Sequence, residues 1–326
     1  PTRNVPVINL THIQGTYVMT SINTNLAAMT ALQSLQKTSM NLLETQTRIS
    51  TGFKVGTASD NAAYFSIAAT MRSDNSAMST VQDALGLGAA TVDVAYTALE
   101  STIDVVDEIK NKLVAAREPG IDRSKVQAEI TELQNQLTSI AESASFNGEN
   151  FLNVDSNAAD YNATKTIVSS FTRSGSNVSI GTISIDITST TLFDADATAT
   201  GILDTESTTT NGGVTYTVAD LDISALTDAA DDLADLEEII STVDGALASV
   251  ITAASDLGAA SKRIELQQTF VSNLMDAVDR GISQLVDADM NEESTRLQAL
   301  QVQQQLGIQA LSIANSSSQS ILSLFR

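Results

Sequence analysis

The stretch that decides the fold runs from Leu233 to Leu285 and reads LADLEEIISTVDGALASVITAASDLGAASKRIELQQTFVSNLMDAVDRGISQL. Apolar residues recur through it at alternating spacings of three and four, and no proline interrupts the pattern. Such spacing keeps one stripe of a helix facing a partner helix, as in a coiled coil. At about 1.5 Å per residue the stripe is roughly 80 Å long, so one compact globule cannot cover it. The stretch therefore predicts a rod-like, mainly helical protein of the kind that assembles.

The rest of the chain supplies partner helices on both sides of this stretch. Helices are predicted at 22–49, from near Asp60 to the helix-breaking pair Pro119-Gly120, and from Asp122 or Ser124 past Ile140. Phe146-Asn147-Gly148 then predicts a turn. At the C-terminal end, helix runs from near Leu226 to Arg326 with a possible break at 288–291.

Two sets of apolar residues follow from these helical patterns. The assembly set, on the terminal helices, consists of Ile22, Leu26, Met29, Leu32, Leu35, Leu42, Ile49, Leu297, Leu300, Leu311, Ile321, Leu324 and Phe325. The bundle seam consists of Val92, Leu99, Ile103, Val106, Leu113, Leu236, Val243, Leu247, Leu257, Ile264, Val271 and Val278. Because a single amphipathic helix cannot bury its own stripe, we expect both sets to be covered by other helices.

Between about Ala163 and Val218 the sequence changes character. The segment is rich in Ser, Thr, Asp and Gly, and its apolar residues alternate with a period of two. Strands are predicted at 183–187 and, after the turn Asn211-Gly212-Gly213, at 214–218. The fold class is therefore mainly α, an antiparallel helical coiled-coil or bundle rod formed by both chain ends, with a small β-rich inserted domain.

Composition excludes several function classes. The chain has 326 residues and a formal net charge of −22, which argues against a nucleic-acid partner, since phosphate binding needs clustered Lys and Arg. No stretch reaches the roughly 18 consecutive apolar residues of a membrane span, so no membrane insertion is predicted. With no Cys and only one His, there is no thiol or imidazole dyad, no two-His metal motif and no readily assembled His-based triad. We predict no enzyme activity, no catalytic residue and no cofactor.

The acidic run between Asp228 and Glu238 has two interpretations. Carboxylates in the first turns of a helix favour the positive end of its dipole, and this interpretation is preferred. A metal site is the alternative, but the run lacks the glycine and terminal glutamate of a calcium loop. We therefore predict no metal site.

Several short motifs at both ends of the chain resemble those of bacterial flagellin. They are Ser21-Ile-Asn-Thr-Asn25, Arg48-Ile-Ser-Thr-Gly52, Ala58-Ser-Asp-Asn-Ala-Ala63, Gln127-Ala-Glu-Ile130, Phe146-Asn-Gly148, Phe151-Leu152 and Ser320-Ile-Leu-Ser-Leu-Phe-Arg326. The resemblance covers roughly 19–152 and 233–326, and Asn61 with Tyr64 is similar to the alphaproteobacterial variety.

The resemblance implies a structural subunit that polymerises into the flagellar filament for swimming motility. It divides the chain into an inner coiled-coil domain lining the filament channel (19–62 plus 286–326), a bundle domain with a β-hairpin (63–162 plus 226–285) and a variable outer domain (163–225). The partners it implies are further copies of the chain, possibly other flagellins, the flagellar export apparatus and a chaperone, and the filament cap and junction proteins.

Pro1 to Val18 precedes the position where flagellins normally begin, which is that of Met19 here. An artificial or mistranslated upstream start is the preferred interpretation, and a real extension or a removable leader are the alternatives. The eighteen residues lack the basic and apolar regions of a secretory signal. The resemblance accordingly implies an extracellular, flagellar protein secreted without a cleavable signal peptide.

Two other functions remain open from the residues. A hook–filament junction protein would share both terminal helices. A glycan-binding flagellin relative would need stacked aromatic residues in the middle segment, where only Phe171, Phe193 and Tyr216 are available.

The resemblance also implies weak recognition by host immune receptors. Many flagellins carry an Arg-Glu-Leu motif that the animal Toll-like receptor binds, whereas Asn111 and Lys112 stand before Leu113 here. The plant receptor reads the stretch matching 47–68, where Asn61 and Tyr64 depart from the usual residues.

Overall fold

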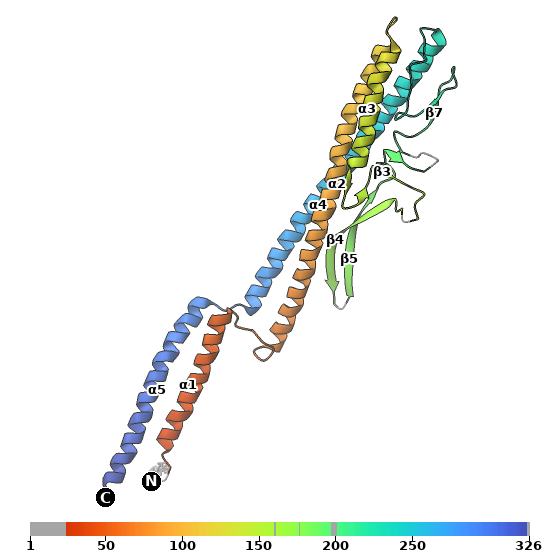
Figure 1. The fold of residues 1–326 in the computed structure, drawn as a ribbon. Helices are drawn as coiled ribbons and strands as arrows, with labels where there is room; N and C mark the ends of the chain where they lie inside the picture. The colour runs from red at the N-terminus through yellow and green to blue at the C-terminus, as the bar shows by residue number, and fades with distance from the viewer. Residues whose placement is uncertain (1–23, 160, 176, 197–200, 325–326) are drawn as a thin grey trace, which may run out of the picture. The chain divides into compact units, whose positions relative to one another are not determined.

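The computed structural model describes residues 24–324, except 160, 176 and 197–200. The described chain forms five helices and four two-stranded sheets (Figure 1). It divides into two compact units. One contains the described residues up to Ala69 together with those from Ile282 onward, and the other runs from Thr70 to Gly281.

The first unit is a hairpin of two helices, α1 (Leu26–Thr51) and α5 (Met290–Leu324). The helices are antiparallel, because Asn25 at the start of α1 donates a hydrogen bond to the Ala314 carbonyl at 2.9 Å, whereas Arg48 near its end contacts Glu293 (Figure 1). The Asn25 side chain also accepts a hydrogen bond from the backbone N–H of Ala28 at 3.0 Å. This N-cap begins the helix at Leu26 rather than at Ile22 as predicted.

α1 ends at Thr51, two residues beyond the predicted 49. Gly52 adopts a left-handed conformation with φ 75° and donates its N–H to the Arg48 carbonyl, which is a common way to end a helix. The following connector pairs with the break in the C-terminal helix. Lys54 and Val55 both donate to the Val286 carbonyl, at 2.7 and 3.2 Å, and Ala288 donates to the Gly52 carbonyl at 2.8 Å. The predicted break is therefore confirmed, between the end of α4 (Ala230–Val286) and the start of α5.

The second unit is built on α2 (Ala62–Ala116), α3 (Arg123–Ser143) and α4. Polar contacts show that α2 and α4 are antiparallel. The Asn75 amide donates to Asp279 at 2.6 Å near the start of α2, and Lys110 pairs with Asp244 at 3.4 Å near its end. The prediction of a long helix stopped before Pro119-Gly120 is confirmed, and Asp122 takes the N-cap position of α3.

The turn between α2 and α3 is held by a buried arginine that sequence patterns did not single out. The Arg123 guanidinium donates to the Ala116 carbonyl at 3.0 Å, to the Leu226 carbonyl at 3.2 Å and to Asp228 at 2.8 Å. Since its side chain is only 6% exposed, Arg123 links the end of α2 to the segment that leads into α4.

The predicted turn after α3 is confirmed as a tight hairpin. β1 (Ser145–Phe146) pairs with β2 (Glu149–Asn150) across Asn147 and Gly148, which have φ values of 53° and 83°. Positive φ at both central residues is what a two-residue hairpin turn requires.

The middle segment contains three more strand pairs. β4 (Thr164–Ser174) and β5 (Asn177–Asp186) form the longest hairpin, with an irregularity between Val168 and Ser170. β3 (Asn153–Val154) pairs in parallel with β6 (Phe193–Asp194), and β7 (Ser207–Thr208) pairs with β8 (Thr215–Tyr216). The strand predicted at 183–187 is confirmed as part of β5. The one predicted at 214–218 is reduced to two residues.

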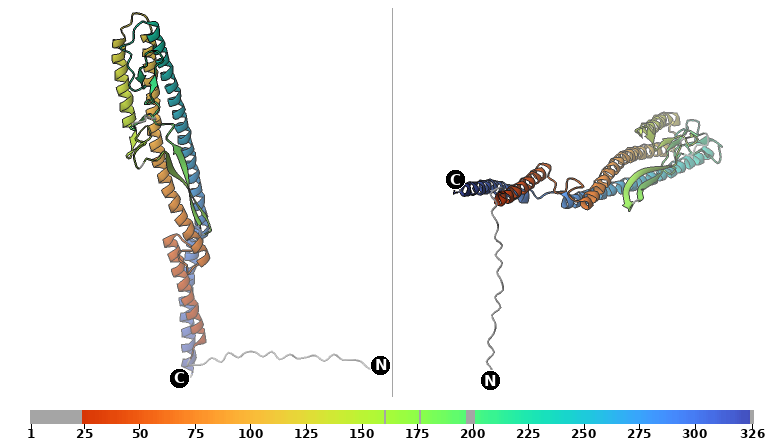
Figure 2. Two further views of the ribbon diagram at one scale, coloured as in Figure 1. Left: turned by 90° about the vertical axis from the view of Figure 1, so that its right-hand side faces the viewer. Right: turned by 90° about the horizontal axis from the view of Figure 1, so that it is seen from below.

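The middle segment shares a core with the helices. Its buried residues, among them Ile183, Ile185, Leu203 and Leu221, belong to the same apolar cluster as the helical seam. The β4–β5 hairpin lies along the helices (Figure 2), where Gln267 of α4 donates to the Ser169 carbonyl at 2.9 Å. The described part of 163–225 is therefore packed onto the bundle.

Among the described residues, α4 is the helix long and apolar enough to pass a test for membrane spans, with an 18-residue window of mean hydropathy 1.2. Its stripe residues Val243, Val250 and Leu257 are buried in the shared core. Of this window, 33% is buried within the described part of the chain, and core helices of bundles are often this apolar.

Candidate assembly surface

The two helices of the first unit meet along a seam with coiled-coil spacing. Buried and half-buried residues alternate at three and four positions on both helices. On α1 they are Ala28, Ala31, Leu35, Thr38, Leu42, Thr45 and Ile49, and on α5 they are Glu293, Leu297, Leu300, Gln304, Gly307, Leu311 and Ala314. Leu35 packs into the space left by Gly307, since a Cβ added to that glycine would lie 3.1 Å from Leu35 Cδ1. Most of the seam is small or polar.

The predicted assembly set therefore separates into two groups. Leu35, Leu42, Ile49, Leu297, Leu300 and Leu311 lie in the seam inside the chain's own hairpin. Leu26, Met29 and Leu32 are exposed instead, Leu26 to 63%. Ile321 and Leu324 lie in α5, but their side chains, like Ile22 and Phe325 as a whole, are outside the described residues.

Further large apolar side chains on the outer face of the hairpin join the exposed group. We call this set the outer apolar face: Leu26, Met29, Leu32, Met40 and Leu43 on α1, with Val302, Leu306, Ile308 and Ile313 on α5. Met40 is 63% exposed and Ile313 68%. Clusters of exposed large apolar side chains on a helix mark interaction surfaces.

The bundle seam lies in the core of the second unit. Ten of its predicted residues are buried, and Ile103 and Val278 are partly buried against the same cluster. A second exposed stripe lies on α4, where Leu266, Phe270 and Leu274 follow one another at four-residue spacing. We call it the α4 stripe. Residues four apart share one face of a helix, so this stripe is continuous.

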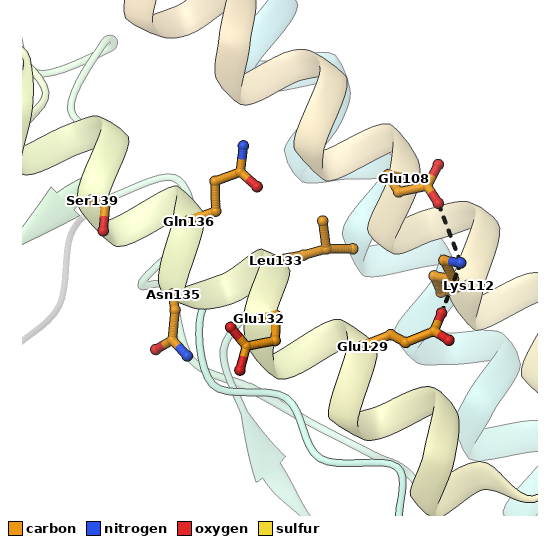
Figure 3. Close-up of a pocket in the computed structure, with 8 residues that line it drawn as sticks. All are labelled: Glu108, Lys112, Glu129, Glu132, Leu133, Asn135, Gln136 and Ser139. Atoms are coloured by element: carbon orange, nitrogen blue, oxygen red, sulfur yellow. Dashed lines mark ion pairs between the residues drawn. The ribbon is translucent and has the colours of Figure 1, made fainter.

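A shallow groove lies between α2 and α3 (Figure 3) and is lined by Glu108, Lys112, Glu129, Glu132, Leu133, Asn135, Gln136 and Ser139. The Lys112 ammonium lies 2.7 Å from Glu129 and 3.4 Å from Glu108. The hydrogen bond to Glu129, more than that to Glu108, raises the pKa of Lys112 above its ordinary value. Lys112 therefore stays charged and bridges the two helices.

Carboxylates in the acidic run at the start of α4 accept hydrogen bonds from backbone N–H groups of the preceding loops. Asp235, which is buried, accepts hydrogen bonds from the backbone N–H groups of Asn211 and Gly212 at 3.0 and 2.7 Å. Asp232 accepts from the Thr227 N–H at 2.7 Å, and the Thr227 hydroxyl lowers the pKa of this carboxyl. In the part of the chain that the structure describes, no three His, Cys, Asp or Glu side chains are arranged to hold a metal ion.

The terminal helices combine two features of a self-assembling protein. Long helices at both chain ends pair within the chain, yet keep an apolar face exposed on each helix. A subunit with such faces, repeating without closure, builds a helical polymer. The fold and surface are thus those of a self-assembling structural subunit.

Comparison with known proteins identifies the family. The model of the bacterial flagellin N-terminal helical region matches residues 22–157, and that of the C-terminal helical region matches 240–325. Flagellin C of Rhizobium meliloti (strain 1021) is 51% identical over 322 residues, covering 94% of this chain and all of the relative. A flagellin of Brucella melitensis is 46% identical over 309 residues, with the same coverage. The chain belongs to the bacterial flagellin family.

A solved structure of Bacillus cereus flagellin is also similar, with a TM-score of 0.34 and 18% identity over 59% of this chain and 88% of that chain. Membership of the family makes the chain a filament subunit of the bacterial flagellum, which is a structural role in motility. Filaments of this family are extracellular, and the two relatives above, both from alphaproteobacteria, agree with the variety that Asn61 and Tyr64 indicate.

Proposed function

We propose that the chain polymerises by burying its outer apolar face and its α4 stripe against neighbouring copies. The observation that carries the proposal is the exposure of nine large apolar side chains on the α1–α5 hairpin, although a seam within the chain already pairs the two helices. Covering apolar area is worth about 25 cal/mol per Å², so a filament gains most from these faces. The seam residues then act indirectly, by holding the hairpin together.

A single charge placed on the outer apolar face tests this. Leu43 is 61% exposed, so Leu43→Glu should leave the monomer folded but put an unpaired carboxylate into a buried subunit contact. We expect Leu43→Glu to abolish filaments in negative-stain images. Asn41→Glu is the matched control, because Asn41 is an exposed polar residue on the same helix, and it should polymerise. Normal filaments from Leu43→Glu would contradict the proposal.

We also propose a division into three domains with the boundaries that the sequence indicates. The inner domain comprises 19–62 plus 286–326, the bundle domain 63–162 plus 226–285, and the outer domain 163–225, with 1–18 as an appendage. The connector after Gly52 and the break before Met290 support the inner boundaries. Limited proteolysis of the monomer should cut first at these two places, and first cuts inside α2 or α4 would contradict the division.

Membership of the flagellin family supports a proposal about the remaining partners. We propose that the chain leaves the cell through the flagellar export apparatus, with a chaperone and without cleavage of a signal peptide, and that it then meets the cap and junction proteins and copolymerises with other flagellins. Secretion should stop in cells whose flagellar export apparatus is disabled. Continued secretion from such cells would refute this route.

Finally, we propose that animal and plant receptors recognise the chain weakly. The groove supports this, because Lys112 neutralises Glu129, which is the family residue retained there, and Asn111 donates to Asp107 at 3.3 Å instead of presenting a cation. A receptor group that binds an Arg-Glu pair would meet a neutral amide in place of the cation and a cation in place of the carboxylate. Asn111→Arg with Lys112→Glu should raise the response of animal reporter cells. Equal potency of the unchanged chain and a motif-complete flagellin would refute the proposal.

A further inference from the structure

The seam between α1 and α5 contains a buried charge that apolar packing does not explain. Glu293 is 4% exposed, and its Oε1 accepts from Arg48 at 3.2 Å and from Arg296 at 3.0 Å. Its Oε2 is buried and has no hydrogen-bond partner among the described atoms. Arg48 and Arg296 are each held by a second carboxylate, Glu44 at 2.6 Å and Glu292 at 2.7 Å. A hydrophobic residue would be the more stabilising choice at such a position.

The apolar part of the seam does not select one alignment of the two helices. Counting outward from the contact between Leu35 and Gly307 in steps of three and four, Leu42 comes opposite Leu300 and Ile49 opposite Glu293. This alignment contains one facing pair of large apolar residues.

Alignments shifted by one heptad also contain one facing pair of large apolar residues. Sliding α1 in one direction places Leu42 at Gly307 and Ile49 at Leu300. Sliding it in the other direction places Leu35 opposite Leu300. Each shift again pairs one large residue with Leu300, as the observed alignment does.

The buried charge does distinguish them. One shift carries Glu293 beyond the end of α1, and the other places it against Leu42, in both cases about 10 Å from Arg48 along the axis. In either shift Glu293 keeps Arg296, which lies on the same helix, but loses Arg48, and removing one partner from a buried charge cluster is destabilising in the general case. The other links between the helices are less selective. Asn25 binds a backbone carbonyl, and the connector at 52–55 pairs mainly through backbone groups, with Val55 and Val286 buried.

We propose that the ion pair of Arg48 and Glu293 fixes the register of α1 on α5, and so decides which side chains make up the outer apolar face. The inference deepens the proposed function, because a one-heptad shift would move Leu43 relative to Leu306 by about 10 Å. Both residues act by positioning the two helices of the hairpin.

Disulfide trapping reports the register directly, since the full chain contains no Cys. A Cβ at position 307 lies 3.8 Å from Leu35 Cβ, which is the mean separation across a disulfide. Leu35→Cys with Gly307→Cys therefore traps the native register, whereas Leu42→Cys with Gly307→Cys and Leu35→Cys with Leu300→Cys trap the two shifted ones. Cross-links within one chain separate from dimers on a non-reducing gel. These cross-links form whether or not the protein polymerises. A failure of the proposed assembly can therefore be told apart from a failure of the proposed register control.

The trapping is done on polymerised protein and, for variants that do not polymerise, on monomer. With Arg48 and Glu293 present, we expect the native pair to cross-link and the shifted pairs to stay reduced. Adding Glu293→Leu should raise the yield of a shifted pair about tenfold, which is the population change for a loss of 1.4 kcal/mol in register preference. Glu292→Leu is the matched control on the exposed neighbour and should change nothing.

Two outcomes overturn the proposal. If Glu293→Leu cross-links only in the native register, the apolar seam and the connector fix the alignment without the ion pair. If no pair cross-links in that variant, the ion pair is needed for helix pairing itself and not for its register. Arg48→Lys keeps the charge and should retain the native register.

Discussion

Substitution of two leucines on α4 tests whether the buried stripe of this helix stabilises the monomer and the exposed stripe stabilises the filament. Leu257 is 1% exposed in the shared core, whereas Leu266, nine residues later, is 62% exposed. Leu257→Ala removes buried methyl groups and leaves a cavity, so it should lower the free energy of unfolding of the monomer by about 3 kcal/mol. Leu266→Ala should change it by less than about 0.5 kcal/mol.

For polymerisation, Leu266→Ala should have the larger effect of the two substitutions. Full burial of a leucine is worth about 1.5–3 kcal/mol, so covering the exposed part of Leu266 in a filament contributes roughly 1–2 kcal/mol. Leu266→Ala should then raise the critical concentration for assembly about 5- to 30-fold. Urea unfolding of monomers and pelleting of filaments measure the two quantities. The reasoning is refuted if Leu266→Ala destabilises the monomer as much as Leu257→Ala does, or leaves the critical concentration unchanged.

Three further outcomes are expected of the second unit. Arg123→Ala should cost about 2–4 kcal/mol in urea unfolding, because it leaves two carbonyls without their donor; Lys125→Ala, at an exposed site, should be neutral. Replacing 164–222 by a short linker should lower the melting temperature of the monomer markedly, since buried residues of this segment share the helical core, and an unchanged melting temperature would show that it packs independently. The hydrogen bond from Thr227 lowers the pKa of Asp232 below its ordinary value of 3.8. The ionised carboxylate therefore stabilises the folded state above about pH 4, and this stabilisation is lost as the pH falls through the lowered pKa. Asp232→Asn should flatten that part of the acid unfolding curve.

The bundle could be predicted from sequence because its seam is made of large apolar residues in strict three–four spacing. Such spacing identifies a helix and its buried stripe at once, as at Val243, Val250 and Leu257. The long hairpin β4–β5 was only half predicted. The irregularity between Val168 and Ser170 interrupts the period-two alternation of β4, so pattern reading missed that strand while finding β5.

The terminal helices show where periodicity stops being informative. Their inner seam uses Thr45, Gln304, Gly307 and Glu293, which no hydropathy pattern selects, while large residues such as Met29 face outward. Periodicity predicts that a side chain is buried against another helix, but it does not show whether that helix belongs to the same chain or to another copy. The assembly set predicted from sequence therefore mixed the two faces.

The measurement that tests the account most directly is the reactivity of a single thiol on the outer apolar face before and after polymerisation. Leu306 is 57% exposed, and the chain has no other cysteine, so Leu306→Cys can be labelled with a maleimide without background. Lys125→Cys, at a position with a side chain 83% exposed, serves as the control. We predict rapid labelling of both monomers, and in filaments strong protection of Cys at the first site with continued labelling at the second. Equal labelling of the first site in monomer and filament would contradict burial of this face between copies.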